Sequence, residues 1–473
     1  MPSPDITEFG DVLGLVAKEA DRYLTSLPEQ PVRLRQAEKV AGSFGGPLPE
    51  EGHGALKALT ELLDPGLGAA IRSSGPRFFH FVIGGTTPAS LAADWLASTL
   101  DQNNAGWVAS PLAAQIEVVS LAWLRQLFGL PDGWSGVLTS GATMANFVGL
   151  ASARRWWGLE QGADVEEQGF AGLPPVPVFS SGYIHPSATK ALRMLGIGSG
   201  RVRRLAGDAA GRLDLDGLER ALRELNGAPS IIVANAGEVN TGDFDPIARM
   251  ADLADAHGAW LHVDGAFGLF AAVSPRTAHL VEGIDRAHSV ISDGHKWLNV
   301  PYDCGFAFVR DPQLQAGIFG ESAAYLPSVD DPHPNFGYLG PEGSRRARSL
   351  AVWATLRAYG RAGYRDIVER HLDLAQRVAR AVDRAPDLER LGPAPLNIVC
   401  FRYRPEGAPE QKLDDLNRRI GEAILEDGRV YVGTTEYEGR IAFRPAIVNW
   451  QTTEGDVDLL VDVIRELGSR LRE

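Results

Sequence analysis

The sequence has little cysteine and no long apolar run, and each shortage excludes a class of protein. Its 473 residues include two cysteines, Cys304 and Cys400, which cannot form a disulfide framework, and no Cys/His spacing resembles a zinc site. Both are expected to be small core residues. No apolar run reaches the roughly 18 residues that a transmembrane helix needs, and the polar start at residues 1–5 does not resemble a signal peptide. We therefore expect a cytoplasmic protein.

Positive charge is also scarce. The chain has 46 Lys and Arg against 60 Asp and Glu, for a formal net charge of −14. Such a balance argues against a nucleic acid or an anionic membrane as partner. The rest of the composition, 44% hydrophobic and 22% charged, is ordinary for a soluble globular protein. A chain of this length predicts two or three domains with a large core.

The N-terminal part, residues 1–75, shows helical patterns separated by loops. Amphipathic patterns cover residues 9–27 and 54–71, with a Gly- and Pro-rich linker at 41–47 between them. An arm of this kind has too little apolar sequence to fold alone. We expect it to pack on another domain or on a second subunit.

Between about residues 110 and 310, short apolar runs alternate with helical patterns. The expected strands are 137–138, 176–179, 231–234, 260–263, 290–291 and 305–309. Helices are expected at 143–157 and 187–195. A third has Asp245 as its N-cap, Pro246 as its first residue and Gly258 as its stop. This alternation predicts a mostly parallel sheet with helices on both faces, whose ligands bind beyond the carboxyl ends of the strands.

The remaining sequence predicts a loop, a long helix and a smaller domain. The loop at 325–343 is rich in Pro, Asp and Gly, and long loops inside compact domains are usually lids or binding loops. A helical stretch follows at about 345–385. The strands expected after it are 398–401 and 441–443, and the helices are 414–427 and 453–472. This last region predicts a small α/β domain.

Two polar features follow expected strands and suit an anionic ligand and a cation. The run TSGAT at 139–143 lies between a strand and a helix, where free N–H groups and small residues would accept a phosphate. Asp264 directly follows the strand at 260–263, and a buried carboxylate there needs a partner such as a cation. If each feature is taken singly, ordinary N-capping explains the run at 139–143, and capping of a loop explains Asp264.

Two further features follow other strands. Lys296 lies in the run DGHKW at 293–297, and His185 lies in YIHPS at 183–187. A lysine among Gly, His and Trp at a sheet edge is a suitable amine nucleophile, and an imidazole is suited to lie over a flat heterocycle. A surface lysine and a core or capping histidine are the ordinary explanations.

Together the four features match the needs of one cofactor. An aldehyde cofactor requires a lysine for its Schiff base, an anion site for its phosphate and a carboxylate that keeps its ring nitrogen protonated. The order of these groups along the chain therefore predicts a pyridoxal phosphate site. A nicotinamide site is disfavoured, because no Gly-x-Gly-x-x-Gly follows the early strands.

The chain resembles the group II pyridoxal-phosphate-dependent decarboxylases, the family of aromatic-amino-acid, glutamate and histidine decarboxylases. The resemblance extends from about Phe44 to the C-terminus. It rests on RFFHF at 77–81, Ala-Ser-Pro at 109–111 with Glu117, residues 139–146, YIH at 183–185, HVDGA at 262–266, DGHKW at 293–297 and DCG at 303–305.

The resemblance implies an α/β fold of the type I pyridoxal-phosphate class. It implies a large domain at 76–345 with a mostly parallel seven-stranded sheet, connecting helices at 346–385 and a small α/β domain at 386–473. It also implies a homodimer with shared active sites, across which the arm at 1–75 packs.

For the site, the resemblance implies a Schiff-base lysine at Lys296, a partner of the ring nitrogen at Asp264 and a ring-stacking imidazole at His185. It places the other cofactor contacts at Gly141, Ala142, Thr143, Ala266, Asp293 and His295 and, from the neighbouring subunit, at Gly343 and Ser344. No metal is implied. Asp293 is expected to help hold the phosphate, at a position where the family commonly has Asn.

Two departures from the family bear on the reaction. Where the animal enzymes have Gly-Thr-Thr, this chain has Gly237, Glu238 and Val239, so a carboxylate is expected near the cofactor's phenolic side or near the substrate. The family's lid tyrosine, which is linked to protonating the carbanion, aligns only loosely here. Phe336 and Tyr338 both fall near that position, and Tyr325 lies earlier.

The leading hypothesis is α-decarboxylation of an L-amino acid, with a proton returned from Tyr338, His295 or Lys296. The aromatic candidates Phe81, Trp107, Tyr325 and Phe336 hint at an aromatic or apolar substrate, although plain packing also explains them. An aminotransferase using Arg444 for the substrate carboxylate, a carbon–carbon lyase and an aldehyde-forming enzyme are alternatives on the same scaffold. A non-catalytic homologue is the remote one.

Overall fold

The structure is a computed structural model that describes residues 8–320 and 333–472. The chain forms two compact units. The first consists of Met1–Ile83, Arg377–Leu391 and Phe401–Glu473, and the second of Gly84–Gln376 and Gly392–Cys400. The finer division expected from the sequence, with boundaries at residues 75, 345 and 385, stays a prediction.

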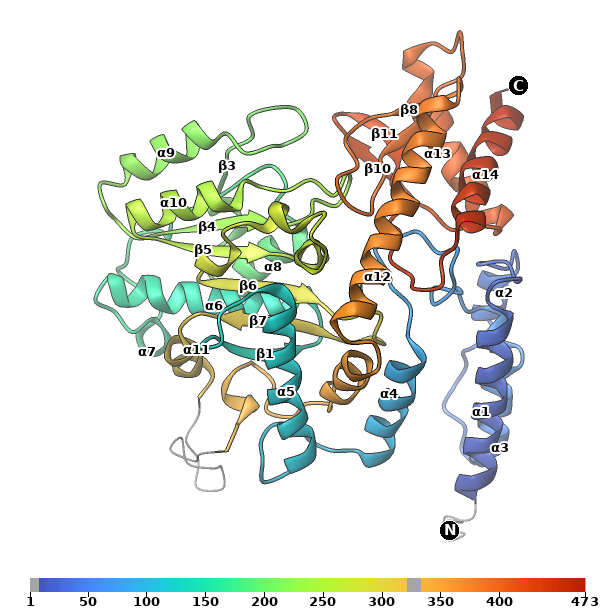
Figure 1. Ribbon diagram of the computed structural model, residues 1–473. Coiled ribbons are helices and arrows are strands. Elements are labelled where there is room, and N and C mark those ends of the chain that lie inside the picture. Colours follow the sequence, from blue (N-terminus) through green and yellow to red (C-terminus); the bar gives the residue numbers. More distant parts are fainter. Residues whose placement is uncertain (1–7, 321–332, 473) are drawn as a thin grey trace. The chain divides into compact units, whose positions relative to one another are not determined.

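A seven-stranded sheet lies at the centre of the second unit, in the order β1-β7-β6-β5-β4-β2-β3 (Figure 1). Its strands are β1 (Ser135–Thr139), β2 (Val178–Ser180), β3 (Val202–Arg204), β4 (Ser230–Asn235), β5 (Ala259–Asp264), β6 (Ser289–Asp293) and β7 (Gly305–Val309). Neighbours from β3 to β6 pair in parallel, and β7 is antiparallel to both β6 and β1. The predicted fold class, a mostly parallel sheet among helices, is confirmed.

Helices cover this sheet. The α-helices are α4 (Pro88–Leu100), α5 (Pro111–Phe128), α6 (Ala142–Glu160), α7 (Val165–Gln168), α8 (Pro186–Met194), α9 (Leu215–Glu224), α10 (Ile247–His257), α11 (Pro312–Phe319) and α12 (Ser349–Arg384). Short 3-10 turns are η2 (Ser199–Arg201), η3 (Gly268–Val273), η4 (Ala278–Val281), η5 (Ile284–Arg286) and η6 (Phe336–Tyr338). Every residue of β4, β5 and β6 is buried, which is expected of strands with helices on both faces.

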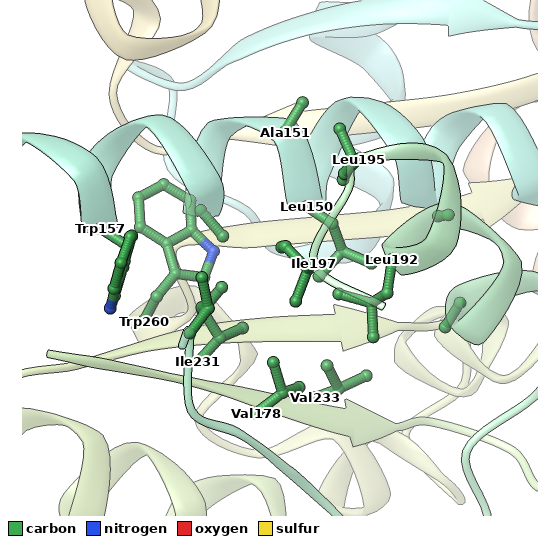
Figure 2. Close-up of a cluster of buried hydrophobic side chains, with 14 of the residues drawn as sticks. Leu150, Ala151, Trp157, Val178, Leu192, Leu195, Ile197, Ile231, Val233 and Trp260 are labelled. Atoms are coloured by element: carbon green, nitrogen blue, oxygen red, sulfur yellow. The ribbon is translucent and has the colours of Figure 1, made fainter. Parts of the chain in front are cut away.

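One large hydrophobic cluster fixes α6 and α8 on the sheet, and in Figure 2 Leu150 and Leu192 point toward the strands. Leu150 and Trp157 come from α6 and Leu192 from α8, and they meet Ile231 of β4 and Trp260 of β5. All five side chains are at most 1% exposed. Because α6 is fixed along its length, its first turn is held at the carboxyl edge of the sheet.

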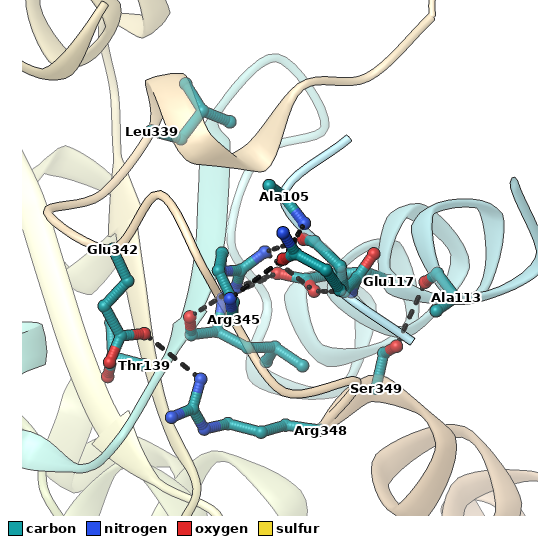
Figure 3. Close-up of polar contacts among 12 residues, drawn as sticks. Ala105, Ala113, Glu117, Thr139, Leu339, Glu342, Arg345, Arg348 and Ser349 are labelled. Carbon is teal, nitrogen blue, oxygen red and sulfur yellow. Dashed lines mark hydrogen bonds and ion pairs between the residues drawn. The ribbon is translucent and has the colours of Figure 1, made fainter. Parts of the chain in front are cut away.

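A buried ion pair fixes the segment that precedes α12 (Figure 3). The Arg345 guanidinium donates to Glu117 Oε1 at 2.8 Å and to the carbonyl oxygens of Leu138 at 2.6 Å and Asn104 at 2.9 Å. Glu117 also accepts from the backbone N–H of Leu138 at 3.0 Å and from the side chain of Asn104 at 2.6 Å. Both charges are satisfied by several hydrogen bonds, which is the condition under which charges are buried.

The first unit contains the N-terminal helices and a small antiparallel sheet. Its N-terminal elements are α1 (Glu8–Ser26), α2 (Ala37–Ala41), α3 (Ala55–Leu63) and η1 (Gly66–Gly68). The small sheet has the order β10-β11-β9-β8 and is formed by β8 (Leu388–Arg390), β9 (Phe401–Tyr403), β10 (Thr434–Tyr437) and β11 (Arg440–Phe443), with α13 (Glu410–Asp427) and α14 (Glu454–Arg472). The expected small α/β region is present.

Several local expectations need correction. The helix expected over 54–71 ends at Leu63, because Pro65 disfavours a helical conformation at the preceding Asp64. Asp245 is not an N-cap, since Pro246 occupies that position and the Asp245 carboxylate accepts hydrogen bonds from Asn235 and Ser181 instead. The long helix expected at 345–385 begins at Ser349 and breaks at Gly360, where φ is 61°. Within the described ranges, no helix combines the length and the apolar character needed to cross a membrane.

Candidate functional site

The predicted site residues gather at one edge of the large sheet. Parallel pairing brings the carboxyl ends of β2, β4, β5 and β6 to the same edge. β1 ends there too, since it and β6 are both antiparallel to β7. His185 follows β2, Glu238 follows β4, Asp264 and Asp293 end β5 and β6, and Gly141 follows β1. The fold thereby places these residues at the edge where such sheets bind ligands.

Lys296 lies against two of its neighbours in the sequence. Its Nζ is 3.1 Å from Asp293 Oδ2, and its side chain is 17% exposed, so the amine remains accessible. His295 Nε2 is 3.5 Å from the same carboxylate oxygen, while its Nδ1 accepts from the N–H of Cys304. Burial lowers the pKa of His295, and its ring stacks on Tyr302 with 4.1 Å between centroids. Asp293 thus contacts both the Lys296 amine and the His295 imidazole.

The first turn of α6 offers N–H groups that, within the described part of the chain, have no hydrogen-bond partner. Gly141 is the N-cap residue, with φ 147° and no side-chain cap, and the first N–H to bond within the helix is that of Ala145. The N–H groups of Ala142 and Thr143 precede it. A Cβ on Gly141 would lie 3.0 Å from the His295 ring, so only glycine keeps this turn open. The turn suits a phosphate.

Asp293 departs from the expected phosphate role in one respect. Its Oδ1 is buried and has no hydrogen-bond partner in the described part of the chain. This atom would lie 3.5 Å from a Cβ on Gly141, so it faces the first turn of α6. Because an ionised carboxylate only accepts hydrogen bonds, it cannot donate to a phosphate as Asn would. Its observed partner is Lys296, and its contact with phosphate stays a prediction.

Asp264 is a buried carboxylate, 5% exposed, held by two donors. The N–H of Ala266 donates to Oδ1 at 3.2 Å, and the Asn146 amide donates to Oδ2 at 2.8 Å. Among the described residues no basic side chain forms an ion pair with it. A buried carboxylate without a protein cation suits a cationic ligand group, such as a protonated ring nitrogen.

His185 is fixed at the start of α8. Its Nδ1 lies 2.7 Å from Ser187 Oγ and accepts from the N–H of Ser187 at 3.2 Å. The side chain thereby caps the helix, which was its ordinary explanation in the sequence. Capping fixes the ring at the carboxyl edge of β2 and does not conflict with a stacking role, because it uses only one ring nitrogen.

Three residues of the site, Asn146, Ser187 and His262, lie within motifs quoted from the sequence, but reasoning from the sequence gave them no role. Asn146 donates to Asp264 and, at 3.2 Å, to Ser187, and its Oδ1 lies 2.8 Å from His262 Nε2. A signal was present, because His262 and Asp264 are two residues apart in one strand and so point to the same face. Asn146 lies one helical turn beyond Ala142.

His262 makes the stability of the protein depend on pH. Burial lowers its pKa to about 4, so it is neutral in the folded protein over a range in which an unfolded chain binds a proton. Since the unfolded state then holds more protons, the free energy of unfolding should fall as pH drops from about 6.5 to about 4. Thermal melting of the apoprotein should show this loss.

The matched variants are His262→Gln and, at an exposed position, His279→Gln. We expect the melting temperature of His262→Gln to depend less steeply on pH than that of the parent, and the slope of His279→Gln to equal the parent's. Equal slopes in all three proteins would contradict the neutral state of His262. Burial also lowers the pKa of His288 to about 4. Part of the dependence of melting temperature on pH should therefore remain in both variants.

Glu238 turns toward its own loop. Its carboxylate accepts from the N–H groups of Asn240 at 2.6 Å and Thr241 at 2.8 Å, and from the Thr241 hydroxyl at 3.0 Å. Burial raises its pKa. These donors occupy both carboxylate oxygens, and a contact with the cofactor stays a prediction.

The residues expected to serve a neighbouring subunit line one cavity. Tyr338, Gly343 and Ser344 lie in its wall, and its volume is about 770 Å³. Phe336 is instead buried, with the Arg345 guanidinium 5.4 Å from its ring centroid. Trp107 stacks on His333, with 4.7 Å between centroids. Phe81 belongs to the first unit, and Tyr325 lies outside the described residues.

These groups fit pyridoxal phosphate. The first turn of α6 offers N–H groups to a phosphate, Lys296 offers an accessible amine, and Asp264 offers a buried carboxylate to a cationic ring nitrogen. All three lie at the carboxyl edge of one mostly parallel sheet. Fold and site together define a pyridoxal-phosphate enzyme of fold type I.

Comparison with known proteins identifies the family. The family model of the pyridoxal-dependent decarboxylase conserved domain matches residues 57–404. Aromatic-L-amino-acid decarboxylase of Bacillus atrophaeus is 31% identical over 84% of this chain and 82% of its own. L-2,4-diaminobutyrate decarboxylase of Rhizobium meliloti is 32% identical over 90% of this chain and 84% of its own. The crystal structure of Oryza sativa TDC with PLP and tryptamine covers both chains fully, with a TM-score of 0.92 and 25% identity.

The chain belongs to the pyridoxal-dependent decarboxylase family. It is a pyridoxal-phosphate-dependent carboxy-lyase that acts on an amino acid. The family, the cofactor and the reaction predicted from the sequence are confirmed. The roles assigned to single residues stay predictions.

Proposed function

We propose that the enzyme removes the α-carboxylate of an L-amino acid with a neutral, preferably aromatic side chain. One observation carries this choice. The cavity that contains Tyr338, Gly343 and Ser344 has no charged side chain among its described lining residues. An acidic or cationic substrate would leave its charge without a partner in such a cavity. A relative named aromatic-L-amino-acid decarboxylase and a similar structure that holds tryptamine support the choice.

The cofactor, when bound, supplies an electron sink that stabilises the carbanion left by the departing carboxylate. The chain's residues would hold it and control protons. Lys296 Nζ would bind the aldehyde carbon, and Asp293 Oδ2, 3.1 Å away, would orient that nitrogen. Asp264 would keep the ring nitrogen protonated, and His185 would cover the ring face. A phosphate would accept from the N–H groups of the first turn of α6.

We also propose a homodimer in which the cavity of one subunit faces the cofactor of the other. Two features support it. Gly343 and Ser344, which the family resemblance assigns to a neighbouring cofactor, line an open cavity in their own subunit. In addition, α1 has no buried residue, and Phe9 and Leu13 on it are 67% and 56% exposed. An amphipathic helix with exposed apolar side chains suits a surface covered by a second subunit. Light scattering should give twice the monomer mass.

Tyr338 is the proposed donor of the proton that returns to the substrate carbon, because this residue lines the same cavity. We further propose a cytoplasmic location. The chain has two cysteines, Cys304 and Cys400, both buried, which are too few for a disulfide framework, and this suits a reducing compartment.

The test is a panel of L-amino acids with products identified by mass spectrometry. We expect amine and CO₂ from aromatic amino acids, with kcat/KM at least about 10-fold higher than for acidic or cationic ones. A keto acid with the cofactor left as pyridoxamine would favour the aminotransferase alternative, and an aldehyde would favour the aldehyde-forming one. Arg444, the residue expected to serve a transaminase, follows β11 in the first unit.

A charge placed in the cavity should change the preference. Val108 is 77% exposed and lines the cavity. Val108→Lys should raise kcat/KM for acidic relative to aromatic substrates by about 10-fold, because it adds an unpaired positive charge there. The control Leu159→Lys adds the same charge at the far end of α6, where Leu159 is 46% exposed. An unchanged ratio in Val108→Lys would exclude this cavity from substrate recognition.

A further inference from the structure

Asn146 bonds to three partners at the buried side of the site. Its Nδ2 donates to Asp264 Oδ2 at 2.8 Å and to Ser187 Oγ at 3.2 Å, and its Oδ1 lies 2.8 Å from His262 Nε2. The side chain is completely buried. It lies on α6, while its partners lie on β5 and at the start of α8. One amide therefore joins three elements of the fold.

The chemistry of the partners fixes the direction of each hydrogen bond. An ionised Asp264 can only accept, so the amide nitrogen of Asn146 must face it and the amide oxygen must face His262. His262 therefore donates through Nε2. Because the pKa of His262 is lowered to about 4, the ring holds a single proton near neutral pH, and its Nδ1 accepts from Ser289 Oγ at 2.8 Å. Ser289 in turn accepts from the Trp260 indole at 3.0 Å.

The hydrogen bonds that run from Asn146 through Ser187 to His185, here called the His185 branch, determine the tautomer of His185. The N–H of Ser187 donates to His185 Nδ1 at 3.2 Å, so this nitrogen is an acceptor and carries no proton. Ser187 Oγ, 2.7 Å away, therefore donates to the same nitrogen while it accepts from Asn146. The ring proton of His185 is thereby left to Nε2.

We propose that Asn146 is the positioning residue of this site, which fixes the Asp264 carboxylate and the His185 imidazole relative to each other. These are the two side chains that would contact the nitrogen and the face of the cofactor ring. Only an amide can donate to both Asp264 and Ser187 while accepting from His262. A hydrocarbon side chain would leave three buried polar groups without partners. The proposal concerns the cofactor and is independent of the substrate.

The variants Asn146→Leu and Asn146→Asp keep a side chain of similar size and differ in the hydrogen bonds that they can make. They therefore separate the positioning role of Asn146 from the space that it fills. Asp keeps the acceptor for His262 but places a second carboxylate against Asp264, and the repulsion between the two charges favours a proton shared by the pair at the lower pH. The described titratable groups that face this position are Asp264 and His262 from β5 and, through Ser187, His185. Near pH 6 the shared proton restores a donor toward Asp264, and near pH 8 it is lost.

The readouts are the affinity of the full-length apoprotein for pyridoxal phosphate, from fluorescence titration, and the induced circular dichroism of the bound cofactor. For Asn146→Leu we expect affinity about 10- to 100-fold below the parent at both pH values, since hydrogen bonds to a charged group are lost. For Asn146→Asp we expect a similar loss at pH 8 and recovery to within a few-fold at pH 6, relative to the parent at each pH.

The control is Asn417→Asp. Asn417 is also fully buried, and its amide bonds to the backbone of Tyr403 and Leu413 in the first unit. This variant loses stability without touching Asp264, so its cofactor affinity should equal the parent's at both pH values. Parent-like affinity and dichroism in Asn146→Leu would overturn the proposal, as would equal losses in Asn146→Asp at the two pH values.

A milder variant covers the case in which Asn146 replacements fail to fold. Ser187→Ala removes only the branch to His185 and leaves the bond from Asn146 to Asp264. We expect altered induced dichroism, because the ring over the cofactor face loses the Ser187 hydroxyl and its link to Asn146 and keeps only the backbone N–H of residue 187, and an affinity loss below 10-fold. Parent-like dichroism in Ser187→Ala would contradict the His185 branch.

Discussion

Lys296→Ala should abolish turnover and the visible absorbance of a lysine-bound cofactor. Lys296 Nζ is the accessible amine at the sheet edge, 3.1 Å from Asp293. Without it the cofactor aldehyde has no protein amine to bind, and product release loses the group that displaces the product amine. We expect kcat to fall by at least about 10⁴-fold, the order found when a nucleophile that acts with its neighbours is removed.

The controls for this prediction separate charge from covalent chemistry. Lys296→Arg keeps a cation beside Asp293 but cannot form a Schiff base, so it should be as inactive as Lys296→Ala. Lys190→Ala removes an exposed lysine of α8 and should leave kcat within about two-fold of the parent. Borohydride reduction followed by peptide mapping should place the trapped cofactor on the peptide that contains Lys296. Turnover by Lys296→Ala at the parental rate would refute the assigned site.

Glu117→Leu should destabilise the second unit by about 3–5 kcal/mol, because it leaves the buried Arg345 charge without its carboxylate partner. The Glu117 and Arg345 side chains are 0% and 2% exposed, so water cannot replace the lost contact. The loss should be measured by denaturant unfolding of the apoprotein. Glu224→Leu is the matched control, since Glu224 pairs with Arg203 at the surface and contributes at most about 1 kcal/mol.

The double variant Glu117→Leu, Arg345→Leu should recover only part of the loss. Removing both charges relieves the unpaired guanidinium, but the Leu138 N–H loses its carboxylate acceptor, and the carbonyls of Leu138 and Asn104 lose their donor. A Glu117→Leu protein as stable as the Glu224→Leu control would exclude the pair as a structural determinant. Because Arg345 follows Ser344, the single variant should also weaken any contact that Ser344 makes to a cofactor.

Much of the fold followed from the sequence because its signals are local. The strand at 305–309 matches β7 residue for residue, and Gly258 ends α10 in the left-handed conformation that its position predicted. Asp264 and Lys296 were singled out because each follows a buried apolar run. The N-cap at Asp245 failed for the opposite reason, since the Asp245 carboxylate bonds to Asn235 and Ser181 across the sheet edge, a tertiary contact that no local pattern shows.

The sequence by itself therefore determined the fold class, the family resemblance and the order of the groups that would bind the cofactor, since these depend on residue type and short-range periodicity. The tertiary structure alone decided which atoms meet. It turned the Glu238 carboxylate into its own loop and set Asp293 against Lys296. It also joined Asp264 to His185 through Asn146 and Ser187, which lie 118 and 77 residues from Asp264 along the chain. Contacts across such separations depend on how buried elements pack, and that packing is what local sequence patterns do not contain.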